Sequence, residues 1–440
     1  MSDLSTKPPS GTRDFLPDDI RRREHVISVV RDVYERYGFE PLETPAFENI
    51  ETLLGKYGEE GNKLIFKILK RGEHEAAGEA DLALRYDLTV PLARVVAQYQ
   101  NVLPKFWKRY QIQPVWRADR PARGRFREFY QCDVDAMGSF SPTVEVEVLA
   151  AVSEVLNRLG FVDFTIRLNH RQILGALLQG AGIDPAKHGD ALVAIDKLNK
   201  IGAEGVTREL AARGIPESLV PGLLSSFAAA EQLEWLRGHV GGTAQREALA
   251  TLQTILELSE KTAAAGRVKL DPSLARGLSY YTGAIMEIAV PDLAGSLGGG
   301  GRYDNLVGMF LGRDVPACGF SLGLERIIVV MTERGMFPAA VAGAGIDVMV
   351  TLWNGESRAD AMVLAGELRS AGLRVDVYPE TDKLGKQFKY ASSRQVPFVA
   401  IVGDDERAQG NVSIKDLRSG EQQTVPRGEA AEHVRTRRQA

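Results

Sequence analysis

An arginine-rich turn between two strand-like segments governs what the first third of the chain can form. Residues 107–117, before the turn, are rich in aromatic and branched side chains. After the turn, apolar and polar residues alternate, with Tyr130, Cys132, Val134 and Ala136 set against Gln131, Asp133 and Asp135. A repeat of two residues indicates a strand with one apolar and one polar face. The pattern therefore predicts a strand hairpin whose second strand carries a row of polar groups.

The turn itself carries a cluster of planar cations: Arg117, Arg120, Arg123, Arg125 and Arg127. Guanidinium groups bind phosphates through two parallel hydrogen bonds. Carboxylates on the neighbouring strand need a cationic or donor partner if they are buried. The two features together predict a pocket for an anionic ligand that also has an ammonium or imidazole end. On these residues alone, a solvated charged hairpin at the surface stays an open alternative.

Two further segments are predicted to contribute to the same pocket. Residues 84–90 are expected to form a strand that places Arg85, Asp87 and Thr89 on one face. Residues 275–283 hold an arginine and two adjacent tyrosines between glycines, which allow close backbone approach. A strand-like segment follows at 284–290. Paired tyrosines in such a loop are also compatible with simple core packing.

Two glycine-rich segments come next, at 298–304 and 318–327. In the second, the glycines precede an apolar run that predicts a helix. The four glycines at 298–301 raise an unrelated nucleotide-dependent α/β enzyme as an alternative. Neither a GxxxxGK phosphate loop nor a strand–GxGxxG–helix context is present, and a bare glycine run more often gives backbone clearance beside a ligand or forms a turn.

Taken together, these segments resemble the histidyl-tRNA synthetase family of class II aminoacyl-tRNA synthetases. Residues 117–135 look like the family's motif 2, residues 319–327 like motif 3, and residues 276–283 like its histidine-specific signature. The resemblance extends from residues 9–15 to residues 415–417. It implies an α/β multidomain fold, in which a class II core with an antiparallel sheet flanked by helices carries a helical insertion and a C-terminal α/β anticodon-binding domain.

The resemblance implies a reaction as well. L-histidine and ATP would give histidyl-adenylate and pyrophosphate, after which histidine would be transferred to the 3' end of tRNA(His) with release of AMP. ATP is then a substrate, Mg²⁺ is expected to accompany it, and no metal site of the protein's own is expected.

Site residues are carried over by motif position. Arg117 and Arg276 are expected to be catalytic, near the α-phosphate and the substrate carboxylate. The expected histidine-binding residues are Asp87, Thr89, Gln131 and Asp135 at the α-ammonium, Tyr280 and Tyr281 on the imidazole side, with Arg117 and Arg276. The expected ATP-binding residues are Arg117, Asp119, Arg125, Arg127 and Arg326, of which Arg125 and Arg326 would meet the β- and γ-phosphates.

The signature loop departs from the family's Arg-Gly-Leu-Asp-Tyr-Tyr at one position, where this chain has Ser279. Serine replaces part of the turn-forming hydrogen bonding of aspartate, so the role of this position is left in doubt. A histidine-sensing regulatory paralogue, like the regulatory subunit of ATP phosphoribosyltransferase, is the alternative. Such paralogues typically lose motif arginines and the C-terminal domain, whereas this chain keeps Arg117, Arg276 and Arg326 and has about a hundred residues after its linker.

Length and composition agree with a multidomain enzyme. At 440 residues the chain exceeds the usual limit for one core, and 44% hydrophobic residues is ordinary for a globular protein. Cys132 and Cys318 show no CxxC spacing, so the reducing cytoplasm is the simplest compartment. No long apolar run or signal pattern is present, so neither a membrane segment nor a targeting segment is expected. The net charge of -4 argues against a non-specific nucleic-acid binder, although a selective RNA partner needs only local basic patches.

The expected catalytic core spans residues 1–335. Apolar stripes predict helices at 19–37 and at 142–159, and alternation predicts a strand at 164–170. Residues from about 172 to 262 read as a helical insertion. In the family an insertion here contacts the tRNA acceptor arm, and a helical packing or dimer element is the open alternative. The family is homodimeric through motif 1, which is expected near residues 41–54.

A small-residue linker is expected at 336–345, followed by a second domain at 346–440. Predicted strands at 346–352, 373–378 and 397–402 alternate with predicted helices at 358–370 and 383–394. This order indicates a parallel sheet with crossover helices. The resemblance implies anticodon binding here, and Lys383, Lys386 and Lys389 form a basic ridge on the second helix, although such ridges are usually just solvated.

Overall fold

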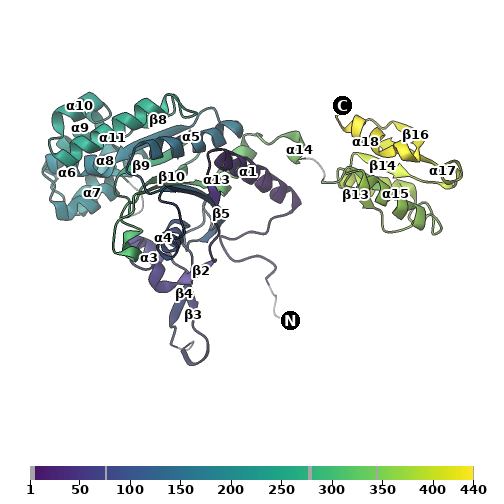
Figure 1. Cartoon of the computed structure of the whole chain (residues 1–440), viewed down its shortest axis with the longest axis horizontal. Helices are drawn as coiled ribbons and strands as arrows, with labels where there is room; N and C mark the ends of the chain where they lie inside the picture. The colour runs from purple at the N-terminus through teal and green to yellow at the C-terminus, as the bar shows by residue number, and fades with distance from the viewer. Residues whose placement is uncertain (1–4, 75–76, 276–279, 343–344, 440) are drawn as a thin grey trace. The chain divides into compact units, whose positions relative to one another are not determined.

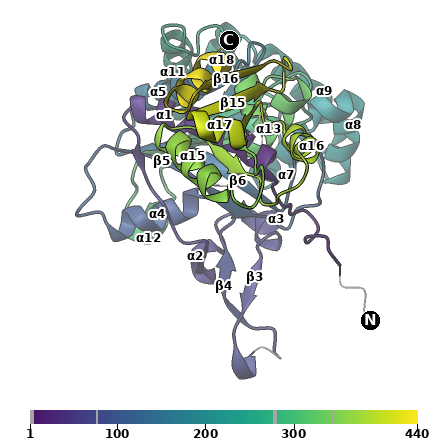
Figure 2. The same cartoon turned by 90° about the vertical axis from the view of Figure 1, so that its right-hand side faces the viewer.

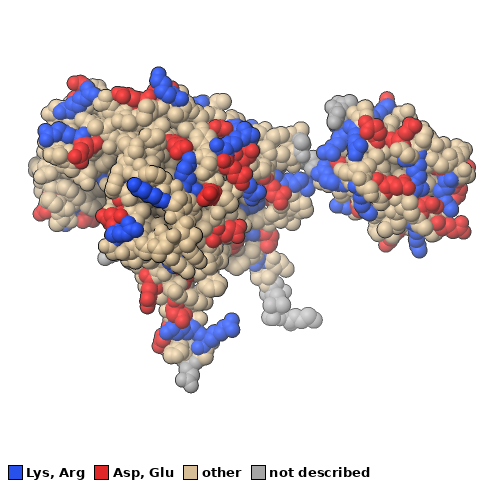
Figure 3. Space-filling view, in the orientation of Figure 1, with Lys and Arg blue, Asp and Glu red and all other residues tan. Residues whose placement is uncertain are grey.

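The computed structural model of the chain describes residues 5–74, 77–275, 280–342 and 345–439 (Figure 1). Contacts divide the chain into two compact units, Met1–Phe337 and Pro338–Ala440. No helix in the described part of the chain is both long and apolar enough to cross a membrane. Lysine and arginine are interspersed with aspartate and glutamate on the visible face of each unit (Figure 3), in keeping with the small net charge.

The first unit is built on an eight-stranded sheet in the order β1-β5-β6-β11-β10-β9-β7-β8. Neighbouring strands are antiparallel except for two parallel pairs, β1 with β5 and β7 with β8. The strands are β1 Glu40–Pro41, β5 Trp107–Trp116, β6 Glu128–Met137, β7 Thr165–His170, β8 Val268–Leu270, β9 Ala284–Ala289, β10 Ser296–Arg302 and β11 Ala317–Gly323.

The main core lies on one face of this sheet, where β6 meets helices α1 (Pro17–Arg36), α5 (Thr143–Arg158) and α13 (Leu324–Glu333). Cys132 and Val134 of β6 point into this core, together with Cys318 of β11. Both cysteines are fully buried and free, and burial raises the pKa of each thiol. The predicted alternation of β6 is therefore confirmed.

The helix and strand limits follow the sequence signals closely in this part of the chain. Helix α1 ends at Arg36, before Gly38, whose φ of +75° lets the chain leave the helix in a left-handed conformation. Helix α5 starts directly after Pro142, and strand β7 lies within the predicted residues 164–170. The predictions for these elements are confirmed.

The strand predicted at 84–90 is wrong. Strand β4 (Ala80–Leu84) ends where that strand was expected to begin, and helix α4 (Thr89–Gln98) starts at its far end. Asp87 Oδ1 accepts a hydrogen bond from the backbone N–H of Val90 at 3.0 Å, so the carboxylate satisfies a donor of the first helical turn. Arg85 turns away and donates to the carbonyl oxygens of Thr44 at 2.6 Å and Pro114 at 2.8 Å.

A second, smaller sheet has three strands in the order β2-β4-β3. It consists of β2 Phe47–Asn49, β3 Lys67–Leu69 and β4. Its strands β3 and β4 project from the first unit (Figure 2). Three short helices belong to the same region: α2 (Ile50–Leu53), α3 (Gly58–Lys63) and α12 (Gly308–Leu311). Helix α2 contacts β4 and α4, and α12 contacts α4. A second apolar cluster forms here and includes Leu53, Tyr57, Tyr280 and Tyr303.

Six helices lie between β7 and β8: α6 Arg171–Gly180, α7 His188–Ile195, α8 Leu198–Ala212, α9 Val220–Ala229, α10 Leu233–His239 and α11 Thr243–Ser259. Their buried leucines and isoleucines, such as Leu174, Leu210 and Ile255, join the main core. The short helix α14 (Ala339–Ala342) follows Pro338 at the start of the second unit.

The second unit has a five-stranded sheet in the order β13-β12-β14-β15-β16. Its elements are β12 Val348–Val350, α15 Arg358–Ser370, β13 Val375–Val377, α16 Leu384–Ser393, β14 Phe398–Ile401, α17 Asp404–Gln409, β15 Asn411–Asp416, β16 Gln422–Pro426 and α18 Ala430–Gln439. Strand β12 pairs in parallel with β13 and β14, as the alternating pattern predicts, and β15 and β16 add an antiparallel edge. Helices α15 and α18 pack on one face and α16 on the other.

Candidate functional site

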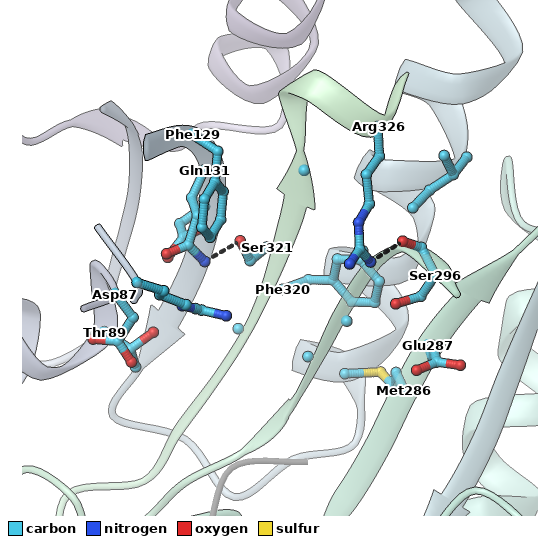
Figure 4. Close-up of a pocket in the computed structure, with 18 of the residues that line it drawn as sticks. Asp87, Thr89, Phe129, Gln131, Met286, Glu287, Ser296, Phe320, Ser321 and Arg326 are labelled. Carbon is cyan, nitrogen blue, oxygen red and sulfur yellow. Dashed lines mark hydrogen bonds between the residues drawn. The ribbon is translucent and has the colours of Figure 1, made fainter. Parts of the chain in front are cut away.

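A cavity of about 360 Å³ opens on the face of the large sheet opposite α1 and α5. Its wall is assembled from β6, β9, β10 and β11, from the arginine-rich turn, and from the first residues of α4 and α13 (Figure 4). Strand β6 contributes Gln131, Asp133 and Asp135, which point to this side because Cys132 and Val134 point to the other. The predicted polar face of β6 is thus the floor of the cavity.

The floor is held together by hydrogen bonds between neighbouring strands. Asp133 lies directly opposite Ser321 of β11 in the register of the sheet. Gln131 Nε2 donates to Ser321 Oγ at 2.6 Å (Figure 4), and the Ser321 hydroxyl lowers the pKa of Asp133, against the effect of burial. Among the described residues, Gln131 Oε1 and Asp133 Oδ1 have no hydrogen-bond partner although both atoms are sealed from solvent. Buried acceptors of this kind call for donors, which a bound ligand supplies.

Two other carboxylates of the cavity are already engaged. Asp135 accepts a hydrogen bond from the Tyr303 hydroxyl, and its Oδ2 lies 2.8 Å from Nη2 of the fully buried Arg109. Asp87 accepts hydrogen bonds from the Tyr57 hydroxyl at 3.0 Å and the Tyr280 hydroxyl at 3.1 Å. Asp135 Oδ2 has this ion pair but no hydrogen-bond partner, whereas Asp133 Oδ1 has neither among the described residues.

The cavity floor carries more buried carboxyl groups than buried cations. In the described part of the chain, the carboxyl groups of Asp87, Asp133 and Asp135 lie near one buried guanidinium, that of Arg109. Burial raises the pKa of all three, that of Asp133 to about 7, while the charge of Arg109 opposes the rise for Asp133 and Asp135. A ligand with a cationic or N–H-rich end would relieve this imbalance.

Three arginines line the cavity away from its floor: Arg117, Arg125 and Arg326. The Arg117 guanidinium is 4.3 Å from the centre of the Tyr86 ring and 5.1 Å from that of Phe129, and its Nε donates to Tyr86 O at 3.0 Å. Arg125 is half exposed and its Nη2 lies 2.7 Å from Asp119 Oδ1. Arg326 donates from Nη1 to Ser296 O at 2.5 Å, on the side of the cavity away from Gln131 (Figure 4). Cations at the mouth and carboxylates on the floor fit a ligand with phosphates at one end and an amine at the other.

Most of the residues named from the sequence meet at this cavity. The residues that line it are Asp87, Thr89, Arg117, Asp119, Arg125, Gln131, Asp135, Tyr280, Tyr281 and Arg326. Arg127 is not among them, because its Nε donates to Asp119 O at 3.1 Å and its Nη1 to Ser10 O at 3.3 Å. Arg276 and Ser279 lie outside the described residues.

The structure adds residues that the sequence did not single out. Asp133 shares the polar face of β6 with Gln131 and Asp135, so the alternation already contained that signal. Arg109, Ser321 and Tyr303 come from other strands, and nothing local in the sequence shows which residues they face. Glu287 of β9 also lines the cavity and pairs with Arg167 at 3.0 Å.

Both units of the chain match known protein families. The family model described as histidyl-tRNA synthetase matches residues 11–327, and the model described as anticodon binding domain matches residues 347–437. The chain belongs to the histidyl-tRNA synthetase family. Histidine–tRNA ligase from Christiangramia forsetii is 42% identical over 96% of this chain and 98% of its own length, and that from Gloeobacter violaceus is 42% identical over 99% of both.

Solved structures of the histidyl-tRNA synthetase family agree. The crystal structure of histidyl-tRNA synthetase from Nostoc sp. PCC 7120 superposes with a TM-score of 0.82 and 31% identity, covering 99% of this chain and 100% of that one. A structure from Bacillus halodurans described as an ATP phosphoribosyltransferase regulatory subunit/histidyl-tRNA synthetase has a TM-score of 0.74 at 23% identity, which shows a shared fold. The predicted family, the class II synthetase fold and the ligase class are confirmed, and the relatives favour the synthetase over the regulatory paralogue.

Proposed function

We propose that this chain activates L-histidine with ATP and transfers it to the 3' end of tRNA(His). One observation carries the proposal: a single cavity combines buried acceptors on β6 with arginines of the turn and of α13. The acceptors suit the amine and imidazole of histidine, and the arginines suit the triphosphate of ATP.

Histidine is proposed to lie along β6. Asp87, Thr89 and Gln131 would hold the α-ammonium, since Gln131 Oε1 is a buried acceptor and Asp87 is a carboxylate at the same end of the cavity. Asp135 was expected there as well from the sequence. Its oxygens are taken by Tyr303 and Arg109, and its charge acts strongly on Tyr281, so we assign it to the imidazole end with Tyr280 and Tyr281.

Asp133 is proposed as an additional contact to the imidazole. Its Oδ1 is a buried acceptor without a partner among the described residues, and Ser321 lies opposite Asp133 in the register of the sheet. A site that hydrogen-bonds both imidazole nitrogens rejects apolar side chains of similar size, because the buried polar groups would then stay unpaired. No separate editing step is needed for such discrimination.

ATP is proposed to bind along the part of the cavity lined by Arg117, Arg125 and Arg326. Arg117 would contact the α-phosphate and the histidine carboxylate, and Arg125 and Arg326 would contact the β- and γ-phosphates. Asp119 fixes Arg125 through their ion pair. Arg276 is proposed as the second arginine at the α-phosphate on its motif position alone. Arg127 is proposed to support the turn without lining the cavity, because its guanidinium donates to the carbonyl oxygens of Asp119 and Ser10.

The first step asks for little covalent chemistry from the protein. The histidine carboxylate attacks the α-phosphorus in line with departing pyrophosphate, and it needs no general base because it is already ionised. The cavity therefore acts by holding the two reactants in line and by neutralising charge that moves onto the phosphate oxygens.

Mg²⁺ is proposed to arrive with ATP, where it would neutralise phosphate charge. Among the described residues there is no group of three or more side chains of the kind that cages a metal. Mg²⁺ in phosphate sites is commonly held by one or two carboxylates together with the phosphates. Glu287 lines the cavity and is the proposed protein ligand.

The second unit is proposed to bind the anticodon region of tRNA(His). Lys383, Lys386 and Lys389 are all exposed on or beside α16, although Lys386 also pairs with Asp382 at 2.8 Å. A homodimer in the cytoplasm is the proposed working form. Phe47 and Leu54, in the region expected to hold motif 1, are 51% and 37% exposed, which a subunit interface would cover.

The test is histidine-dependent exchange of pyrophosphate into ATP, with each amino acid offered in turn. Exchange should require histidine and should fall by about a hundredfold or more in Arg117→Ala and Arg276→Ala. Arg120→Ala is the matched control, because Arg120 belongs to the same turn but is exposed and does not line the cavity. Charging of tRNA(His) completes the test. Histidine binding without exchange would contradict the proposal and favour the regulatory paralogue.

A further inference from the structure

A segment at the beginning of the chain, Pro9–Phe15, lies against the arginine-rich turn; we call it the N-terminal strap. The strap begins with a tight turn in which both the N–H and the hydroxyl of Thr12 donate to Pro9 O, at 3.0 and 2.8 Å. It leads directly into α1. All seven of its residues belong to the described part of the chain, and none of them lines the cavity.

The strap holds Arg127, the last arginine of the turn. The backbone N–H of Arg127 donates to Gly11 O at 2.8 Å, and the Arg127 guanidinium reaches Ser10 O. Gly11 has a φ of +85°, and a Cβ placed on it would lie 2.7 Å from Cγ of Arg127. Only glycine fits this contact without moving the Arg127 side chain.

Arg127 connects the strap to the residues that face the cavity. Its Nε donates to Asp119 O, and its own carbonyl accepts from the N–H of Arg117 at 2.9 Å. Asp119 in turn holds Arg125 through their ion pair. The two proposed phosphate ligands of the turn, Arg117 and Arg125, are therefore linked to the strap through Arg127, directly for Arg117 and by way of Asp119 for Arg125.

A second contact backs the same wall of the cavity. The Arg13 guanidinium lies 3.4 Å from the centre of the Phe126 ring, and Phe126 lines the cavity next to Arg125. Arg13 is also 4.0 Å from Glu325 Oε1, and Glu325 binds the backbone N–H of Tyr130 at 2.9 Å. The guanidinium thus supports the C-terminal end of the turn, where the turn enters β6.

We propose that the N-terminal strap positions the arginine-rich turn for ATP, with Gly11 and Arg13 as positioning residues that leave the α-ammonium and imidazole contacts of histidine unaffected. This inference rests on the proposed function. The separation follows from the contacts, because Asp87, Gln131 and Asp133 are held by α4, β11 and neighbouring tyrosines, none of which belongs to the strap.

The decisive variant is Gly11→Ala, with Gly72→Ala as its matched control. Gly72 has a similar φ of +77°, but a Cβ there meets no atom within 4 Å, so the control reproduces the backbone strain without the contact to Arg127. Exchange kinetics should show a KM for ATP raised about tenfold in Gly11→Ala, with a clearly smaller rise in the KM for histidine, because the strap reaches the histidine subsite only through the carboxylate contact of Arg117. Gly72→Ala should match the wild type in both constants.

Arg13→Gln keeps the test valid if Gly11→Ala does not fold, since the Arg13 side chain is one-third exposed and its replacement leaves the core intact. It should raise the KM for ATP by about threefold to tenfold, again with a clearly smaller rise in the KM for histidine. Equal effects on ATP and histidine, or no effect on ATP, would overturn the inference. Direct titration of ATP onto each variant separates the outcomes: weaker ATP binding supports the strap even if exchange proves not to depend on histidine, which would count against the proposed function alone.

Discussion

Asp133 carries a buried acceptor oxygen, Oδ1, that has no hydrogen-bond donor among the described residues. Asp135 next to it has the Tyr303 hydroxyl and the Arg109 guanidinium, whereas Asp133 Oδ1 has no donor among the described residues. A buried carboxylate oxygen of this kind favours a ligand that supplies an N–H group. Its contribution to substrate selection can be measured separately from ATP binding.

We expect Asp133→Asn to raise the KM for histidine by about tenfold to a hundredfold, because a hydrogen bond to a charged acceptor contributes roughly 1.5–3 kcal/mol. The KM for ATP should change little, since Arg125 and Arg326, the proposed ligands of the β- and γ-phosphates, belong to the turn and to α13 and not to β6. Pyrophosphate exchange at varied histidine and ATP gives both constants. Asp81→Asn, at an exposed aspartate of β4, is the control, and a normal histidine KM in Asp133→Asn would remove Asp133 from the imidazole site.

Asp133 also predicts how stability depends on pH without ligands. Its pKa is about 7 in the fold and is ordinarily about 3.9 in an unfolded chain, so the folded state binds this proton more tightly. The resulting stabilisation is complete below about pH 4 and is lost as the pH rises through 7. Between about pH 5 and 7, the wild type should lose free energy of unfolding relative to Asp133→Asn, by up to about 1.4 kcal/mol per pH unit. Urea unfolding of both proteins across this range checks it, and a constant difference would contradict it.

Among single elements, α16 offers a direct test, because its proposed contact with tRNA can be measured separately from the reaction in the first unit. Its lysines are exposed, and the ion pair of Lys386 with Asp382 is the main competitor for a phosphate. We expect Lys383→Ala, Lys386→Ala and Lys389→Ala together to weaken tRNA binding. The slope of the logarithm of affinity against the logarithm of salt concentration should become shallower by roughly 0.7–0.9 for each phosphate that the variant leaves without a lysine.

Histidine-dependent pyrophosphate exchange should not change in the triple alanine variant, because α16 belongs to the other unit. The same three positions changed to arginine provide the control and should retain tRNA binding. Unchanged affinity and salt dependence in the alanine variant, measured by filter binding, would show that this ridge is only solvated.

Elements with a strong apolar repeat were predictable from the sequence, and elements fixed by distant contacts were not. The stripes of α1 and α5 and the alternation of β6 are local and were predicted correctly. Residues 84–90 alternate as a strand does, but α4 begins at Thr89 and Asp87 accepts a hydrogen bond from its first turn. The same short run of residues is compatible with a strand and with the start of a helix. The glycines of β10 are poor strand formers, and the strand is fixed by pairing with β9 and β11, whose backbone lies too close to Gly300 and Gly301 for a Cβ atom.

The candidate site divides in the same way. Gln131, Asp135 and the arginines of the turn could be named because their motif spacing is visible in the sequence. Arg109 and Ser321 could not, because their closeness to Asp133 and Asp135 depends on how β5 and β11 pair with β6. Arg127 has the residue type and place of a phosphate ligand and its side chain contacts the N-terminal strap, so its role in ATP binding stays a prediction.

For the whole molecule, the main fact is that each unit has apolar clusters of its own. All residues of the cavity belong to the first unit. We therefore expect a chain of residues 1–337 to fold and to keep histidine-dependent exchange within about threefold of the full chain. Its kcat/KM for charging tRNA(His) should fall by at least about tenfold, the equivalent of about 1.4 kcal/mol of binding free energy. Equal charging by both proteins would remove the second unit from tRNA recognition.

The sealed cysteines of the main core have a practical consequence. A thiol reacts with maleimides and similar reagents as its thiolate, and both Cys132 and Cys318 are buried and held in the neutral form by raised pKa values. The sequence contains no other cysteine. A fluorophore or spin label aimed at one added surface cysteine, such as Ser393→Cys at the end of α16, should therefore attach at that position alone, so that the natural chain serves as its own background for spectroscopy.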